Sequence, residues 1–120
     1  MRYTIEARDG YLRGELVDRQ TPQETREFGE ALHAAMRDKA VGRLLVVVRS
    51  SLPVFRVEEY QLSEFLNRMM AIPGAKIAVV SDSRELAAAH EYVQLIASQR
   101  GLALRAFSSE PAAIRWLARD

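Results

Sequence analysis

The stretch Arg43-Leu44-Leu45-Val46-Val47-Val48-Arg49 decides the fold class of this chain. Its five central residues are all apolar, so a strand formed here carries apolar side chains on both of its faces. Such a run is typical of an inner strand of a parallel sheet that helices cover on both sides. We therefore predict an α/β protein in which residues 43–49 form a central strand.

Two later stretches share this character, Lys76 to Ser81 and Leu102 to Phe107, and we predict that both form inner strands. Between the strands, apolar residues recur at spacings of three and four, which places them on one stripe of a helix. The predicted stripes are Phe28, Ala31, Leu32, Ala35 and Met36, then Leu62, Phe65, Leu66, Met69 and Met70, and then Leu86, Ala89, Val93, Ile96 and Ala97; a last short helix carries Ile114, Trp116 and Leu117.

The first helix has the clearest boundary signals. In Thr21-Pro22-Gln23-Glu24, Thr21 is the predicted N-cap, Pro22 the first helical residue and Glu24 the partner in a capping box. Gly42 is placed to end this helix. The later helices are predicted to start near Val57, at Asp82 or Ser83, and after Ser108 or Ser109.

The amino-terminal segment predicts a β-hairpin. Residues 3–8 alternate between apolar and polar side chains, and Asp9-Gly10 is a strong signal for a two-residue hairpin loop. If these two residues form the loop, Arg8 faces Tyr11 and the register of the hairpin is fixed. The apolar face then pairs Ala7 with Leu12, Ile5 with Gly14 and Tyr3 with Leu16, and the polar face pairs Glu6 with Arg13 and Thr4 with Glu15.

These elements predict a mixed β-sheet with an N-terminal antiparallel hairpin, parallel inner strands and about four helices, in the order ββαβαβαβα. Residues 1–120 are expected to form one domain, because the chain is of single-domain length and contains no linker or repeat.

Composition excludes several classes of protein. The chain has 17 Lys and Arg against 16 Asp and Glu, a net charge of +1, which is too small for general nucleic-acid binding. It has no cysteine, which excludes disulfides and thiol chemistry. The longest apolar run, Leu44 to Val48, is far too short for a membrane span, and no signal-peptide core follows Met1. We expect a cytoplasmic protein.

The carboxyl ends of the predicted strands are the place where an α/β sheet usually binds ligands, because helix N-termini there attract anions. Polar residues gather at these ends, although serine and aspartate before a helix are also ordinary caps. The candidate ligand-binding residues are Arg49, Ser81, Ser83, Arg84 and Ser108.

No arrangement typical of an enzyme is visible. His33 and His90 lie beside the predicted buried stripes, away from the strand ends, and neither has a neighbouring nucleophile or orienting carboxylate. No cluster of His, Asp and Glu has metal-ligand spacing, since Glu58, Glu59 and Glu64 share one predicted helix without a histidine. We expect no catalytic residue, no metal and no cofactor.

The element order, the opening hairpin, and the run Leu44 to Val48 with the polar loop and helix Glu58 to Met70 that follow it resemble the STAS domain superfamily. The most similar branch is the SpoIIAA-like one, small bacterial proteins that are similar to anti-anti-sigma factors. The resemblance implies a mixed-sheet domain that works by binding, either to regulatory protein partners or, in some relatives, to small or lipidic ligands. Where the family carries its Asp-Ser-[Ser/Thr]-Gly phosphorylation motif, this chain has Phe55-Arg56-Val57-Glu58-Glu59.

Two functions follow as hypotheses. The first is a non-enzymatic regulatory or protein-interaction module without the phosphorylation motif, whose partner-binding residues are Arg49, Ser50, Ser51, Phe55, Arg56 and Glu58. The alternative is a carrier or sensor of a small anionic or acyl/lipid ligand, in a pocket lined by Phe55, Leu62 and Leu66 with Arg49 or Arg84 at its mouth. A regulatory protein, a second copy of the chain and a small ligand are thus the partners considered, without nucleic acid or a membrane span.

Overall fold

The computed structural model describes residues 1–51 and 59–119, and within these the predicted order of strands and helices is confirmed. The strands are β1 (Arg2–Arg8), β2 (Tyr11–Val17), β3 (Arg43–Arg49), β4 (Lys76–Ser81) and β5 (Ala103–Phe107). The helices are α1 (Pro22–Lys39), α2 (Glu59–Met70), α3 (Arg84–Gln99) and α4 (Glu110–Ala118).

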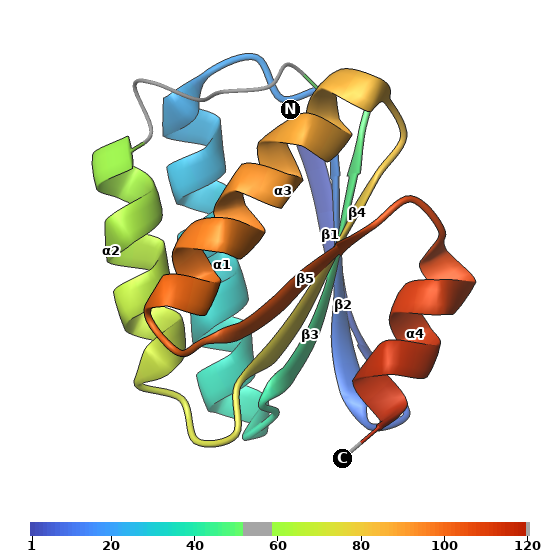
Figure 1. Ribbon diagram of the computed structural model, residues 1–120. Coiled ribbons are helices and arrows are strands. Elements are labelled where there is room, and N and C mark those ends of the chain that lie inside the picture. The colour runs from blue at the N-terminus through green and yellow to red at the C-terminus, as the bar shows by residue number, and fades with distance from the viewer. Residues whose placement is uncertain (52–58, 120) are drawn as a thin grey trace.

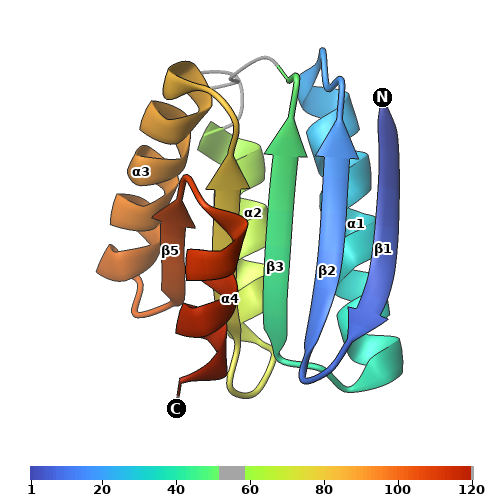
Figure 2. The same ribbon diagram turned by 90° about the vertical axis from the view of Figure 1, so that its right-hand side faces the viewer.

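The strands lie in the sheet in the same order as in the sequence, β1-β2-β3-β4-β5. β1 is antiparallel to β2, and each later strand is parallel to its predecessor. Right-handed crossovers that all step in one direction place their helices on one face of the sheet. Figures 1 and 2 show α1, α2 and α3 on that face and α4 alone on the opposite one.

Three helices on one face meet a spacing problem. Adjacent strands lie about 4.8 Å apart, whereas packed helices need about 8–10 Å between their axes. The outer helices spread toward the sheet edges: α1 packs on β1 and β2, and α3 on β4 and β5. The middle helix, α2, packs against α1 and stands farther from the sheet, as Figure 1 shows.

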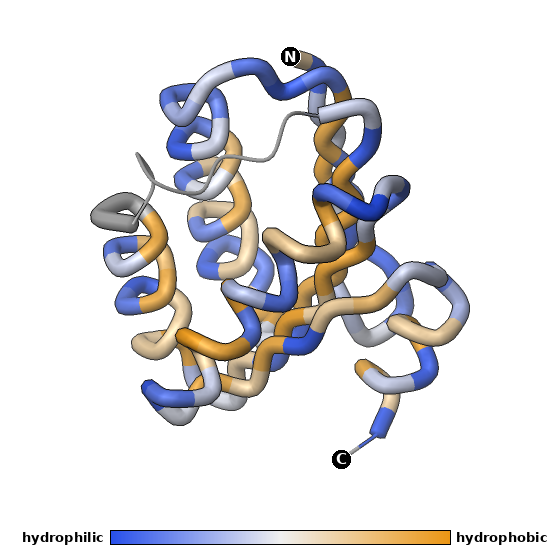
Figure 3. Tube along the Cα trace, turned by 45° about the horizontal axis from the view of Figure 1, so that its top comes forward, coloured by the Kyte–Doolittle hydropathy of each residue, from blue (hydrophilic) through white to orange (hydrophobic). Residues whose placement is uncertain are grey.

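The central strand β3 is buried on both faces, as its sequence predicts. Leu44, Val46 and Val48 belong to the core beneath α1, α2 and α3, whereas Leu45 and Val47 belong to the core beneath α4. All five side chains are at most 7% exposed. Figure 3 shows this apolar centre as the orange part of the trace.

The hairpin register is confirmed, with Arg8 opposite Tyr11, Ile5 opposite Gly14 and Tyr3 opposite Leu16. Gly14 leaves room for α1, because a Cβ atom there would lie 2.5 Å from Cδ2 of Leu32 and the leucine would have to shift. Glu6 and Arg13 lie opposite each other as predicted, but each forms its ion pairs with other residues. Glu6 forms an ion pair with Arg8 of its own strand, and Arg13 turns to Glu15 and Glu110.

The capping box at Thr21 and Glu24 is confirmed, but α1 ends earlier than predicted. Ala40, not Gly42, provides the left-handed residue that ends the helix, with φ 52° and ψ 45°. Gly42 has a different role: a Cβ atom at this position would lie 2.9 Å from the carbonyl oxygen of Pro73, so only glycine allows the two loops to approach this closely.

Two predictions of burial are wrong. β5 was expected to be an inner strand but forms the edge of the sheet, and its residues Ala103 and Arg105 are exposed. Met70, predicted to lie on the buried stripe of α2, is 46% exposed at the last position of the helix, whereas its neighbour Met69 is fully buried.

α4 is held to the second face of the sheet near both of its ends, at the N-terminus by the hydrogen bonds from Arg13 of β2 to Glu110. Ser109 caps its N-terminus and accepts from the Ala112 amide, as one of the two predicted caps. Near its C-terminus, Lys76 Nζ donates to the Trp116 carbonyl at 2.6 Å, and Arg43 donates to the Leu117 carbonyl. These cations also stabilise the negative end of the helix dipole.

The left-handed conformation of Ala40 predicts that glycine stabilises the protein at this position and destabilises it elsewhere in α1. Ala40→Gly should stabilise the protein by about 1 kcal/mol, because glycine adopts positive φ without the Cβ clash. Ala34→Gly, on the exposed face of the same helix, should instead destabilise it by about 1 kcal/mol. Urea unfolding of the two variants measures both effects, and equal losses in both would contradict the conformation at Ala40.

Candidate functional site

A cavity of about 140 Å³ lies beneath α2, between this helix, the neighbouring helices α1 and α3, and the sheet. Its wall is mainly apolar and includes Leu16, Phe28, Val46, Leu62, Phe65 and Val93. The cavity lies where α2 stands over the sheet: Leu66 and Met69 of α2 reach the core, whereas Leu62 and Phe65 line the cavity. Gly29 lets α1 and α2 approach at this level: a Cβ atom there would lie 3.2 Å from Cδ1 of Phe65.

Two buried polar side chains line the cavity, Arg19 and His90. Arg19, in the loop after β2, is 7% exposed, and its Nη1 donates to Oγ1 of Thr25 at 3.2 Å. His90, from α3, is 8% exposed, and its buried Nδ1 has no hydrogen-bond partner within residues 1–51 and 59–119. Burial, and then the positive charge of Arg19, lower the pKa of His90 to about 4. The imidazole is therefore neutral near pH 7.

Charged residues of α1 and α2 form the exposed side of the cavity. Arg26 and Glu64 face each other across the two helices at 3.9 Å, and Arg68 pairs with Glu64 at 3.0 Å and with Glu30 at 3.9 Å. These side chains are one-third to one-half exposed, so each ion pair is weak and screened by water. The two helices are thus joined here by contacts that separate at little cost.

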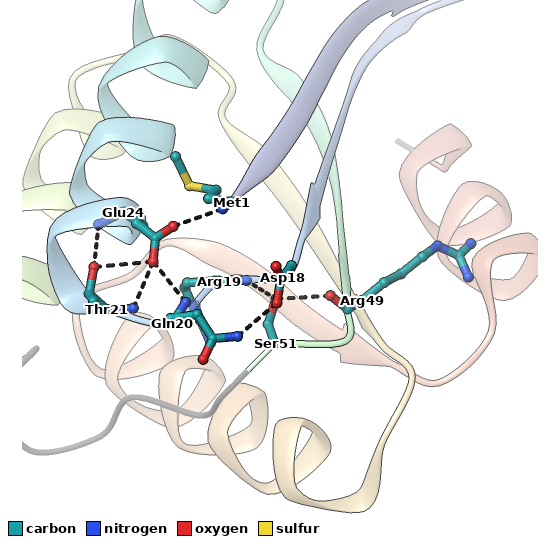
Figure 4. Close-up of polar contacts among 8 residues, drawn as sticks. All are labelled: Met1, Asp18, Arg19, Gln20, Thr21, Glu24, Arg49 and Ser51. Carbon is teal, nitrogen blue, oxygen red and sulfur yellow. Dashed lines mark hydrogen bonds and ion pairs between the residues drawn. The ribbon is translucent and has the colours of Figure 1, made fainter.

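The loops after β2 and β3 hold Arg19 in place (Figure 4). The Arg19 amide donates to Ser51 Oγ at 2.9 Å, and Ser51 Oγ in turn donates to the Arg49 carbonyl at 2.9 Å. The Asp18 amide donates to the same carbonyl at 3.1 Å. The serine that was predicted to contact a partner therefore positions a residue of the cavity.

Beside these loops, Glu24 organises the start of α1, as Figure 4 shows. Its carboxylate accepts from the Gln20 and Thr21 amides and lies 3.1 Å from the Met1 ammonium. These hydrogen bonds, the one from Gln20 above all, lower the pKa of Glu24 to about 2. The segment between β2 and α1 that carries Arg19 is thus fixed at both of its ends.

The predicted strand-end residues do not line the cavity in the described part of the chain. Ser83 is the N-cap of α3, and its Oγ accepts from the Leu86 amide at 3.2 Å. Ser81 is buried, whereas Arg84 and Ser108 are exposed. Ser50 is also exposed, and its amide donates to Asp82 of the neighbouring loop at 3.0 Å.

Arg49 lies on the face of the sheet that carries α4. It joins a group of four charged residues in which Arg13 binds Glu110 through two hydrogen bonds of 2.9 and 3.0 Å, and Arg49 lies 3.5 Å from Glu15 and 3.7 Å from Glu110. The hydrogen bond from Arg13 lowers the pKa of Glu110. Through these ion pairs Arg49 connects β3 to α4.

Three predicted partner-binding residues, Phe55, Arg56 and Glu58, lie outside the described residues, as does Val57, where the second helix was predicted to start. Of the predicted pocket residues, Leu62 lines the cavity, whereas Leu66 is fully buried in the core. Neither Arg19 nor His90 was among the binding residues predicted from the sequence. A signal existed for His90, which falls on the same stripe as Leu86, Ala89 and Val93; none existed for Arg19.

No protein-family model matches this chain, and no curated protein matches it either. The resemblance to STAS domains therefore stays a prediction from the sequence pattern. Among the described residues, no helix has the length and apolarity that crossing a membrane requires, and no three His, Asp or Glu side chains come together as a metal site.

The buried histidine predicts how stability depends on pH. The pKa of His90 is about 4 in the folded protein, against 6.5 for an unperturbed histidine, so the unfolded chain binds a proton more readily. Stability is therefore complete above about pH 6.5 and decreases as the pH falls toward 4, by about 2 kcal/mol between pH 7 and pH 5.

Urea unfolding at several pH values between about 5 and 7 measures this slope, and His90→Gln should reduce it strongly. The Glu24 carboxylate contributes little in this window, because its stabilisation is lost only as the pH falls from 4.5 toward 2. His33→Gln is the control: the pKa of His33 is also lowered, but this residue is more exposed, so its removal should change the slope less. An unchanged slope in His90→Gln would contradict the burial of this histidine.

Proposed function

We propose that this protein is a binding module that acts as a carrier or sensor of a small ligand, an anionic or acyl compound whose apolar body occupies the cavity beneath α2. The observation that supports this function is the cavity itself, with a mainly apolar wall that includes two buried polar side chains. Ligand sites in proteins commonly combine a mainly apolar, concave wall with a few polar groups that orient the ligand.

The surroundings of the cavity also suit a ligand that enters and leaves. Among the described contacts, exposed ion pairs and the approach of Gly29 to Phe65 join α1 to α2 beside it. A small outward movement of α2 breaks contacts that are individually weak in water. α2 is also attached by Leu66 and Met69, which are fully buried near its C-terminal end, and by hydrogen bonds from Arg100 to Ser63 and Asn67.

The regulatory interaction module stays a prediction, with less support from the described residues. The contact surface predicted for it runs from Arg49 to Glu58, and residues 52–58 of that segment are not described. The described part makes intrachain contacts: Arg49 with Glu15 and Glu110, and Ser51 with the Arg19 amide.

Binding of small probes tests the proposed function. Benzyl alcohol, benzoate and hexanoate each place an apolar body of suitable size beside a polar head. A probe that binds the folded protein, present at about ten times its Kd, should raise the Tm by about 3–6 °C. At least one of the three should produce such a shift in a thermal unfolding experiment.

Two phenylalanine variants of α3 show whether a shift comes from the cavity. Val93→Phe places a ring in the cavity wall and should abolish the shift, whereas Leu95→Phe adds a ring at an exposed position of the same helix and should preserve it. If no probe gives a shift that depends on Val93, the proposed function is wrong.

A further inference from the structure

His90 is a polar residue of the cavity wall whose hydrogen bonding is incomplete. It comes from α3, lines the cavity and is 8% exposed, and its buried Nδ1 has no partner in the described ranges 1–51 and 59–119. A buried polar atom without a hydrogen bond lowers stability. A ligand whose polar group reaches this nitrogen supplies the missing hydrogen bond and removes that cost.

Arg19, the second buried polar residue of the wall, is engaged by the protein itself. Its Nη1 donates to Thr25 Oγ1 at 3.2 Å, its amide donates to Ser51 Oγ, and it makes a further interaction within the chain. These contacts hold the guanidinium in place without a ligand. An anion is therefore not required to pair with it.

The other charges at the cavity also have partners. Arg26, Glu64 and Arg68 line it on the exposed side, where the two arginines pair with Glu64 and Glu30. The wall is otherwise mainly apolar. Moving a charged group from water into such surroundings costs much more than moving an uncharged polar group. The cavity therefore favours an uncharged ligand.

The protonation state of His90 fits an uncharged acyl group. Burial lowers the pKa of this residue to about 4, so near pH 7 one ring nitrogen donates a hydrogen bond and the other accepts one. A carboxamide carries both an accepting oxygen and a donating nitrogen. It can therefore pair with the imidazole whichever of the two nitrogens holds the proton.

The size of the cavity limits the apolar body of the ligand. A cavity of about 150 Å³ in another protein holds benzene, and this one measures about 140 Å³. An apolar body of about six carbon atoms fits such a space, whereas a long acyl chain does not.

We propose that the ligand of this cavity is a compact uncharged acyl compound, with a carboxamide as the best-fitting head group, whose acyl group hydrogen-bonds to His90 and whose apolar body lies against Val46 and Phe65. This inference rests on the proposed function and narrows its ligand from anionic or acyl compounds to small neutral acyl compounds. It also names the residue that recognises the head group.

Two probes of nearly equal shape test the charge of the ligand on the unmodified protein. Benzamide and benzoate are titrated by calorimetry near pH 7, and benzamide should bind about tenfold more tightly or better, because burying the carboxylate costs more. Palmitamide tests the size limit and should not compete with benzamide.

Histidine variants test the hydrogen bond. His90→Leu should weaken benzamide about tenfold and leave toluene, which has no polar group, nearly unchanged. His33→Leu is the matched control, because this histidine of α1 does not line the cavity, and it should leave both affinities unchanged.

Nuclear magnetic resonance of the imidazole nitrogens tests the same contact without a substitution. The chain has two histidines, so His33 serves as the internal control. Benzamide should shift the nitrogen resonances of His90 and leave those of His33 in place. This measurement decides if His90→Leu does not fold.

The outcomes separate this inference from the proposed function. Benzoate binding as tightly as benzamide, in a manner that Val93→Phe abolishes, would overturn the uncharged class while the cavity remains a binding site. Unchanged benzamide affinity in His90→Leu, or unshifted His90 resonances, would overturn the role of the histidine. Displacement of benzamide by palmitamide would overturn the size limit. If benzamide and the three probes of the proposed function all fail to bind, both proposals are wrong.

Discussion

The difference between strand spacing and helix spacing is the constraint on which the rest of this structure depends. Parallel strands that follow one another in both sequence and space put every crossover helix on one face, at intervals of about 4.8 Å where helices need about 8–10 Å. The protein resolves this by spreading α1 and α3 toward the sheet edges and leaving α2 farther out. The cavity beneath α2 is thus a result of topology, and the polar residues around it give this space its chemistry.

Arg19 and His90 are costly residues in such a place. Burial of a guanidinium carries a desolvation cost, and burial of an imidazole whose Nδ1 has no partner among the described residues lowers stability. The chain nevertheless builds structure around one of them, since Ser51, Asp18 and the capping box of α1 fix the segment that carries Arg19.

The sequence was informative where structure depends on neighbouring residues. The apolar run of β3, the Asp9-Gly10 turn and the capping box at Thr21 each act over a few positions, and the hairpin register followed from the turn alone. Prediction failed where burial depends on distant elements: β5 has an inner-strand pattern but no strand beyond it, and Met70 is exposed at the end of α2, whereas its neighbour Met69 is buried. Arg19 was missed for the same reason, because its burial comes from contacts between loops, whereas His90 was visible on the stripe of α3.

The order of the strands also determines how two copies of the sheet would meet edge to edge. β1 and β5 are the open edges, and both carry arginine at positions that oppose each other in a symmetric pairing. Antiparallel pairing of two β1 strands along their full length would place Arg2 opposite Arg8 at both ends, and pairing of two β5 strands would bring Arg105 opposite its own copy. Like charges directly across a strand pair are destabilising, and natural sheets protect their edges in this way. The arginines at both edges therefore disfavour symmetric pairing of two sheets along either edge strand.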